Sequence, residues 1–128
     1  MKTTILGRTG LEATVMGIGC GGPSRVGQSA GRSEDESVAV VRQALDASIN
    51  FVVTAEAYRT EEIVGRAISD LDRSKLVIST QKSSGGHLTA QDVVQSLEAS
   101  LKRLGTDEES DRRRLEHIFR NVDSVSGN

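Results

Sequence analysis

Short apolar runs alternate with longer amphipathic stretches along most of the chain. In the amphipathic stretches, apolar side chains recur three and four residues apart, which predicts helices with one buried face. The apolar runs lack the strict alternation of half-exposed strands, as expected of parallel strands covered on both faces. Strands are predicted to end near residue 20 and to occupy 49–54 and 76–80, and helices to occupy 33–48, 60–71 and 89–104.

This order, a strand and then a helix three times over, favours parallel strands joined by right-handed crossovers. The fold class is therefore α/β. A hairpin is expected before the first of these strands, because two β-prone runs within residues 3–16 flank a turn with two glycines. Ser33 and Glu36 have the spacing of a capping box, and Thr89 with Asp92 marks the third helix start.

The spacing also predicts which side chains each helix buries. In the first helix the expected stripe is Val38, Val41, Ala44, Leu45 and Ser48. In the second it is Ile63, Ala67 and Leu71, and in the third it is Val93, Leu97, Leu101 and Leu104.

The character of the sequence changes after Thr106. Residues 107–114 are almost wholly charged, and no run suited to a fourth strand follows them. Leu115, Ile118, Phe119 and Val122 then recur at helical spacing, which predicts a short amphipathic helix over about 111–123. We therefore expect two parts, an α/β part over 1–107 and a divergent, charged helical tail over 108–128.

The amino-acid composition excludes several classes of function. The 128 residues carry 16 Lys and Arg against 18 Asp and Glu, and this near-balance argues against a dedicated nucleic-acid partner. A single cysteine excludes an internal disulfide. No apolar run is long enough to span a membrane, and the N-terminus does not have the form of a secretory signal, so a cytoplasmic location is expected.

Three glycines, Gly17, Gly19 and Gly22, form a G-x-G-x-x-G pattern. A dinucleotide fingerprint requires a helix to begin at such glycines, but Pro23 and a long loop follow here. The pattern therefore favours a close-packed turn between a strand and a loop.

Tyr58 follows the 49–54 strand, at the strand end where ligands bind in α/β folds. It is interpreted either as a general acid, if a neighbour lowers its pKa, or as an ordinary tyrosine on the rim. Lys82 ends the next strand on the same rim and is more simply explained as an exposed lysine. Cys20 is expected to be a small buried residue. His87 and His117 are isolated, so no metal site is predicted.

Taken together, these pieces resemble the aldo/keto reductase family between residues 5 and 107. The segment 6–12 (LGRTGLE) is similar to the family's opening hairpin, and 16–21 (MGIGCG) to the end of its first barrel strand. The segment 49–58 (INFVVTAEAY) resembles the signature G-I-N-F-x-D-T-A-x-x-Y, and 77–82 (VISTQK) the strand that carries the family's lysine. Residues 96–107 (SLEASLKRLGTD) resemble the signature S-L-x-x-S-L-x-R-L-G-x-D.

The resemblance implies a (β/α)₈ TIM barrel that transfers a hydride from NADPH to a small aldehyde or ketone. In the family a tyrosine protonates the carbonyl oxygen, a lysine lowers that tyrosine's pKa, an aspartate holds the lysine, and a histidine on the fourth strand orients the substrate. Tyr58 occupies the tyrosine position, so it is the candidate catalytic residue. The turn Gly19-Cys20-Gly21 is the candidate cofactor-binding segment for the nicotinamide side of NADP(H).

The chain departs from the family pattern at two catalytic positions. Val53 stands at the aspartate position and Gln81 at the lysine position, with Lys82 one residue late. Since strand side chains alternate, Lys82 is expected to point away from the site unless a bulge turns it. The histidine strand has no counterpart.

Length is the last constraint. A (β/α)₈ barrel takes about 250 residues, so the sequence predicts a partial, truncated barrel with an N-terminal hairpin and about three βα units. Weak or absent NADP(H) binding and impaired carbonyl reduction are expected. The alternative is a non-catalytic remnant, or pseudoenzyme, that acts through protein association. Open sheet edges are expected to promote self-association unless something covers them.

Overall fold

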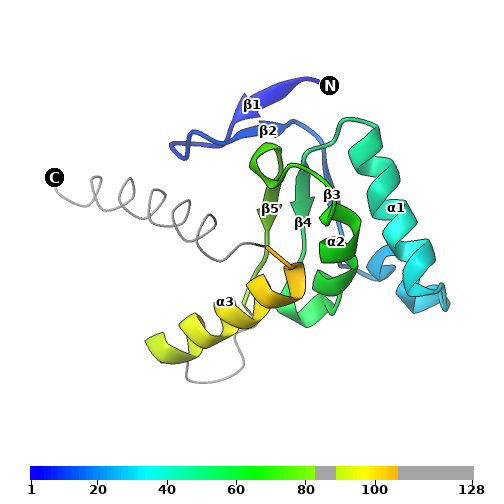
Figure 1. Ribbon diagram of the computed structural model, residues 1–128, viewed down its shortest axis with the longest axis vertical. Coiled ribbons are helices and arrows are strands. Elements are labelled where there is room, and N and C mark those ends of the chain that lie inside the picture. Colours follow the sequence, from blue (N-terminus) through cyan, green and yellow to red (C-terminus); the bar gives the residue numbers. More distant parts are fainter. Residues whose placement is uncertain (83–88, 107–128) are drawn as a thin grey trace, which may run out of the picture.

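The computed structural model of the protein describes residues 1–82 and 89–106 (Figure 1). The strands are β1 (Thr3–Ile5), β2 (Glu12–Thr14), β3 (Gly17–Gly19), β4 (Phe51–Val53) and β5 (Val77–Ser79). The α-helices are α1 (Glu34–Asp46), α2 (Glu61–Ile68) and α3 (Ala90–Leu104). Short 3₁₀ helices are η1 (Arg25–Ala30), η2 (Glu56–Tyr58) and η3 (Arg73–Lys75).

Strands β3, β4 and β5 form a parallel sheet in that order, as the sequence predicts. Ile18, Val52 and Ile78 lie opposite one another in register, so their side chains share one face. Apolar side chains from the helices pack against that face and complete the core. Its buried members are Cys20, Val26, Val41, Val52, Ile63, Val64, Ala67, Ile68, Leu76 and Leu104.

The hairpin β1–β2 lies across the amino-terminal end of the sheet (Figure 1). Asn50, which immediately precedes β4, fastens it there. The Asn50 amide oxygen accepts from the backbone N–H of Thr14 at 2.7 Å, and its amide nitrogen donates to the carbonyl of Glu12 at 2.9 Å. The same nitrogen also donates to the carbonyl of Lys75 at 3.2 Å. One side chain thus connects the hairpin, β4 and the approach to β5.

Both predicted capping boxes are present. Ser33 accepts from the N–H of Glu36, and the Glu36 carboxylate accepts from the N–H of Ser33. The backbone N–H and the hydroxyl of Ser33 both donate to the Glu36 carboxylate, and these two hydrogen bonds, the backbone one first, lower the pKa of Glu36. Thr89 and Asp92 form the same arrangement at the start of α3. The local sequence therefore sets where these two helices begin.

The helix faces differ in part from the predicted stripes. Helix α1 ends at Asp46, so Ser48 lies beyond it, exposed and with a left-handed φ of 68°. Val93 is 44% exposed, whereas Ser96 and Ser100 of the same helix are buried. Helix α3 is rotated from its most apolar face because it packs against α2, and because Ser96 and Arg103 make polar contacts with neighbouring elements.

The fold prediction is confirmed in its coarse form: a hairpin, three parallel strands and three α-helices, without a closed barrel among the described residues. The tail 108–128, its helix over 111–123, and both His87 and His117 lie outside the described residues, so those predictions stay predictions. No helix in the described ranges is both long and apolar enough to cross a membrane. The cytoplasmic location stays a prediction.

Helices α2 and α3 approach each other closely at Gly65. A Cβ atom at Gly65 would lie 2.7 Å from the carbonyl oxygen of Arg103 and 2.8 Å from that of Leu104. These are backbone atoms at the end of a helix, so they cannot turn aside as a side chain would. Only glycine allows this spacing.

We expect Gly65→Ala to destabilise the protein although alanine favours helix. The clash costs about 1–3 kcal/mol, against a gain in helix propensity of about 1 kcal/mol. Urea unfolding followed by circular dichroism measures the net change. Gln95→Ala, on the exposed face of α3, is the control and should leave the midpoint unchanged. An unchanged or higher midpoint for Gly65→Ala would contradict the close packing of α2 on α3.

Candidate functional site

The candidate site lies at the carboxyl ends of the three parallel strands, where ligands bind in α/β folds. Hydrogen bonds extend the sheet beyond the strand ends. The N–H of Cys20 donates to the carbonyl of Val53 at 2.8 Å, and the N–H of Thr54 donates to that of Ser79 at 2.8 Å. The N–H of Glu56 donates to the carbonyl of Gln81 at 3.0 Å. The segments after β3, β4 and β5 are therefore held side by side.

Tyr58 lies in η2, half-buried, with its ring against the backbone of Gly21. A Cβ at Gly21 would be 2.3 Å from the tyrosine Cε2, so only glycine admits the ring there. The guanidinium Nε of Arg25 donates to the Tyr58 carbonyl at 2.9 Å. The structure thus brings Tyr58 and Gly21, two of the residues predicted for the site, into contact.

Arg25 and Val26 both have left-handed backbone conformations, with φ of 46° and 50°. For a β-branched residue such as Val26 this is an unusual conformation. Val26 is nevertheless buried in the core, and Arg25 is anchored to Tyr58. The turn after β3 therefore stores strain beside the tyrosine, offset by one buried side chain and one hydrogen bond.

Cys20 is fully buried, as predicted. Its N–H donates to the carbonyl of Val53, and its own carbonyl accepts a hydrogen bond from the hydroxyl of Thr60 at 3.0 Å. Because the Thr60 hydrogen points to Cys20, the hydroxyl of Thr54 is the donor in the 2.9 Å contact between the two threonines. Burial raises the pKa of the Cys20 thiol to about 11. The thiol is therefore neutral at physiological pH, and it is no nucleophile.

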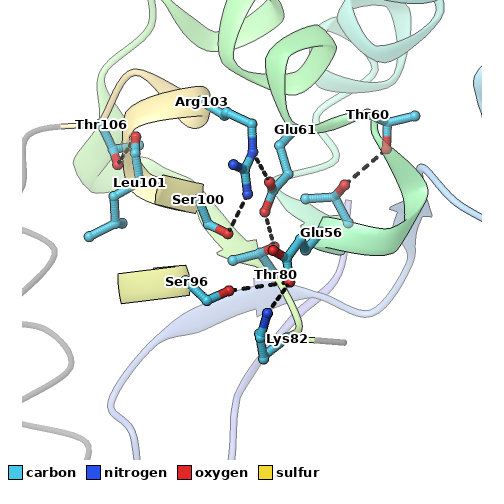
Figure 2. A network of polar contacts seen from close by, with 11 residues as sticks. Glu56, Thr60, Glu61, Thr80, Lys82, Ser96, Ser100, Leu101, Arg103 and Thr106 are labelled. Carbon is cyan, nitrogen blue, oxygen red and sulfur yellow. Dashed lines mark hydrogen bonds and ion pairs between the residues drawn. The ribbon is translucent and has the colours of Figure 1, made fainter. Parts of the chain in front are cut away.

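Lys82 forms an ion pair at this edge of the sheet. Its expected orientation away from the site stays a prediction. Its Nζ lies 2.8 Å from the Oε2 atom of Glu56, which also accepts from the hydroxyl of Ser96 at 3.2 Å (Figure 2). Glu56, which the sequence analysis did not single out, is thus the partner of both Lys82 and Ser96.

A second polar cluster lies beside the first (Figure 2). Glu61 is 1% exposed, and its carboxylate accepts from the hydroxyl of Thr80 and from the Nε atom of Arg103, each at 2.5 Å. Arg103 also donates to the hydroxyl of Ser100 at 3.2 Å. Sequence reasoning missed this cluster. In sequence, Glu61 has only the features of an acidic residue in the first turn of a helix.

Val53 and Gln81, the two departures from the family pattern, both lie among the described residues. Val53 is half-buried on β4, in register with Gly19 and Ser79, and brings no charge to the strand ends. Gln81 follows β5 and is exposed. Within the described ranges no three His, Cys, Asp or Glu side chains gather as a metal site would require.

The cofactor-binding segment offers little to NADP(H) in the described part of the chain. The backbone groups of Cys20 are both engaged within the fold, and the ring of Tyr58 covers Gly21. Gly19 alone of the three is exposed, with open space where its side chain would be. These residues do not fit the whole cofactor. They provide at most a contact for one edge of it.

A family model described as the aldo/keto reductase family matches residues 17–116, most of the chain. The chain belongs to the aldo/keto reductase family. Aldo-keto reductase YhdN of Bacillus subtilis is 35% identical over 121 residues, which cover 84% of this chain and 35% of that relative. A protein of Schizosaccharomyces pombe named putative voltage-gated potassium channel subunit beta is 34% identical, with 78% of this chain and 32% of that relative covered.

Solved aldo-keto reductases have the same local fold. The thermostable aldo-keto reductase Tm1743 superposes with a TM-score of 0.70 at 34% identity, covering 84% of this chain and 40% of that one. A Bombyx mori aldo-keto reductase in complex with NADP gives 0.68 at 28% identity, covering 83% and 35%. The chain spans about a third of the length of the curated relatives it matches.

We expect the Cys20 thiol to react very slowly in the folded protein. Raising its pKa from 9.0 to about 11 lowers the thiolate fraction about a hundredfold near neutral pH, and burial adds a steric barrier. Reaction with Ellman's reagent at pH 8, in buffer and in urea, measures the difference. Gln95→Cys supplies an exposed thiol as control. Equal rates for the two thiols in buffer would contradict the burial of Cys20.

We expect Glu61 and Arg103 to be strongly coupled. Removing one member of a buried ion pair lowers the free energy of unfolding by about 3–5 kcal/mol. Because Arg103 is about a third exposed, we expect the loss for this pair to lie at the lower end of that range. A double-mutant cycle with Glu61→Gln and Arg103→Met should give a coupling of about 2 kcal/mol in urea unfolding. The exposed pair Arg42 and Asp70 is the control, with a much smaller coupling. Additive effects at Glu61 and Arg103 would show that the pair contributes nothing jointly.

Proposed function

We propose that this chain carries a remnant of the carbonyl-reducing site of an NADPH-dependent oxidoreductase, with Tyr58 as its candidate catalytic residue, and that the site is too impaired for measurable turnover by the chain alone. The whole activity, the small carbonyl substrate and the cofactor are carried over from the family. The (β/α)₈ barrel of the family is carried over in the same way, with the described βα units as its first part. The observation that carries the proposal is the pairing of Lys82 with Glu56.

A phenol donates a proton well near neutral pH only when a neighbouring cation stabilises the phenolate left behind. The family's lysine and aspartate positions hold Gln81 and Val53, and neither side chain carries a charge. The residue after the lysine position, Lys82, has its ammonium compensated by the carboxylate of Glu56. Assistance by a general acid is worth about 10²–10⁴-fold in rate, and most of that is absent from this arrangement.

A second candidate function is association with another protein. One relative's name describes it as a channel subunit, a role in an assembly. In the described part of this chain the outer edges of β3 and β5 are unpaired, and such edges template contact with other chains. Self-association through these edges belongs to this candidate.

We expect no NADPH oxidation above background with a panel of small aldehydes and ketones. Absorbance at the reduced nicotinamide band follows the reaction, and Tyr58→Phe is the matched control. The two proteins should give the same rate. Turnover well above background that Tyr58→Phe abolishes would contradict the proposed impairment.

A companion experiment separates the proton donor from the cofactor. Val53→Asp combined with Gln81→Lys restores the two charges, and NADPH fluorescence measures binding independently of turnover. A gain in rate would place the defect in the missing charges. No gain together with no binding would place it in the cofactor site.

A further inference from the structure

Arg25 links the turn after β3 to the segment that carries Tyr58. Its guanidinium Nε donates to the carbonyl of Tyr58 at 2.9 Å, and its backbone N–H donates to the carbonyl of Gly21 at 3.3 Å. Gly21 is the residue on which the ring of Tyr58 lies, so closely that a Cβ atom would come within 2.3 Å of the ring. One arginine therefore connects the backbone of the tyrosine with the residue against which its ring rests.

The backbone around Arg25 has an unusual conformation. Arg25, Val26 and Gly27 have φ of 46°, 50° and 95°, all in the left-handed region. Residues with a side chain are strained there, β-branched ones most of all. Such strain persists only where the surrounding structure enforces it, and it is often found beside functional groups. The conformation at Arg25 therefore requires contacts that hold it in place.

Those contacts come from the core and from helix α1. Val26 is buried in the core, and its carbonyl accepts a hydrogen bond from the hydroxyl of Ser37 at 2.9 Å. Ser37 is fully buried in α1, and the side-chain amide of Gln28 donates to the same hydroxyl at 2.8 Å. The strained turn is thus fixed to a long helix. Arg25 extends from this fixed point to Tyr58.

The tyrosine segment has little rigidity of its own. Tyr58 ends η2, which is a single 3₁₀ turn, and such turns have hydrogen bonds of poor geometry. The next contact along the chain is at Thr60, whose buried hydroxyl donates to the carbonyl of Cys20 at 3.0 Å. That contact fixes the start of α2 but leaves the backbone of Tyr58 free to turn. The hydrogen bond from Arg25 acts on Tyr58 itself.

We propose that Arg25 is the positioning residue of Tyr58, which keeps the phenol ring against Gly21. The inference rests on the proposed role of Tyr58 as the candidate catalytic residue. A proton donor has to lie within hydrogen-bond reach of the atom that it protonates. A tyrosine that turns away from the strand ends does not meet this condition. Arg25 acts through the backbone of Tyr58 and does not need to touch a substrate.

The chain contains its own reporter, because Tyr58 is its single tyrosine and it has no tryptophan. Tyrosine emission therefore comes from this one side chain. Acrylamide quenching measures how freely the ring is reached, on a scale that runs from the folded protein to the chain unfolded in urea. The measurement needs neither NADPH nor a carbonyl substrate.

Two substitutions separate the hydrogen bond from the rest of the side chain. Arg25→Met removes the donor and keeps an aliphatic stem, whereas Arg25→Lys keeps a donor and the positive charge. We expect Arg25→Met to raise the quenching constant several-fold, toward the value of the unfolded chain. Arg25→Lys should restore most of the protection.

Arg59→Met is the matched control. Arg59 follows Tyr58 directly, is exposed, and also has a left-handed φ, of 56°. The same substitution at this position should leave the quenching unchanged. An equal rise in Arg59→Met, or no rise in Arg25→Met, would overturn the proposal.

Urea unfolding followed by circular dichroism separates positioning from stability. In Arg25→Met the quenching should rise while the unfolding midpoint changes little, which a purely structural role would not produce. If Arg25→Met does not fold, Arg25→Gly decides the question. Glycine removes the same donor and adopts a left-handed φ without strain, so this variant should fold. It should show the same rise in quenching, and an unchanged quenching constant would overturn the proposal.

The positioning role and the proposed function fail separately. Unchanged quenching in the Arg25 variants would remove the positioning role and leave the impaired site as proposed. NADPH oxidation that Tyr58→Phe abolishes would contradict the impairment, whereas a rise in quenching in Arg25→Met would still support the positioning role.

Discussion

The buried carboxylate of Glu61 connects elements that are far apart in the sequence. Glu61 is the first residue of α2. Its carboxylate accepts a hydrogen bond from the hydroxyl of Thr80, beyond β5, and pairs with Arg103 near the end of α3. At 1% exposure it has no access to water, so its charge is stable only with these donors in place. The close approach of α2 to α3 at Gly65 also restricts where α3 can lie. Together they fix where α3 lies against the sheet.

The position of α3 in turn determines the chemistry of the strand ends. The hydroxyl of Ser96, on the same helix, donates to the Glu56 carboxylate, which also forms the ion pair with Lys82. The ammonium is therefore part of a local polar network that includes a helix side chain. Tyr58 stands at the family's tyrosine position, whereas Lys82 comes one residue after the lysine position, which Gln81 occupies. The network explains why the lysine contacts a carboxylate, and why the site is proposed to be impaired.

The position of α3 also shapes an apolar groove of about 310 Å³ beside β5. Leu97, Leu101 and Leu104 line it together with the hairpin turn, which Asn50 fastens to the sheet. The polar clusters and the apolar groove thus lie on two sides of one helix. A change that displaces α3 would therefore alter both the polar contacts of Glu61 and Arg103 and the shape of the groove.

Much of this structure is local, and the sequence determined it. The capping boxes at Ser33 and Thr89 set two helix starts because their donors and acceptors are three residues apart. The alternation of strands and helices, the hairpin and the family followed from short-range pattern and motif. Tertiary structure decided the rotation of α3, which exposes Val93 and buries Ser96. It also decided the burial of Glu61 and the partner of Lys82. These contacts join residues 19 to 42 positions apart, and no local pattern encodes the distance between two side chains that meet only after the chain has folded.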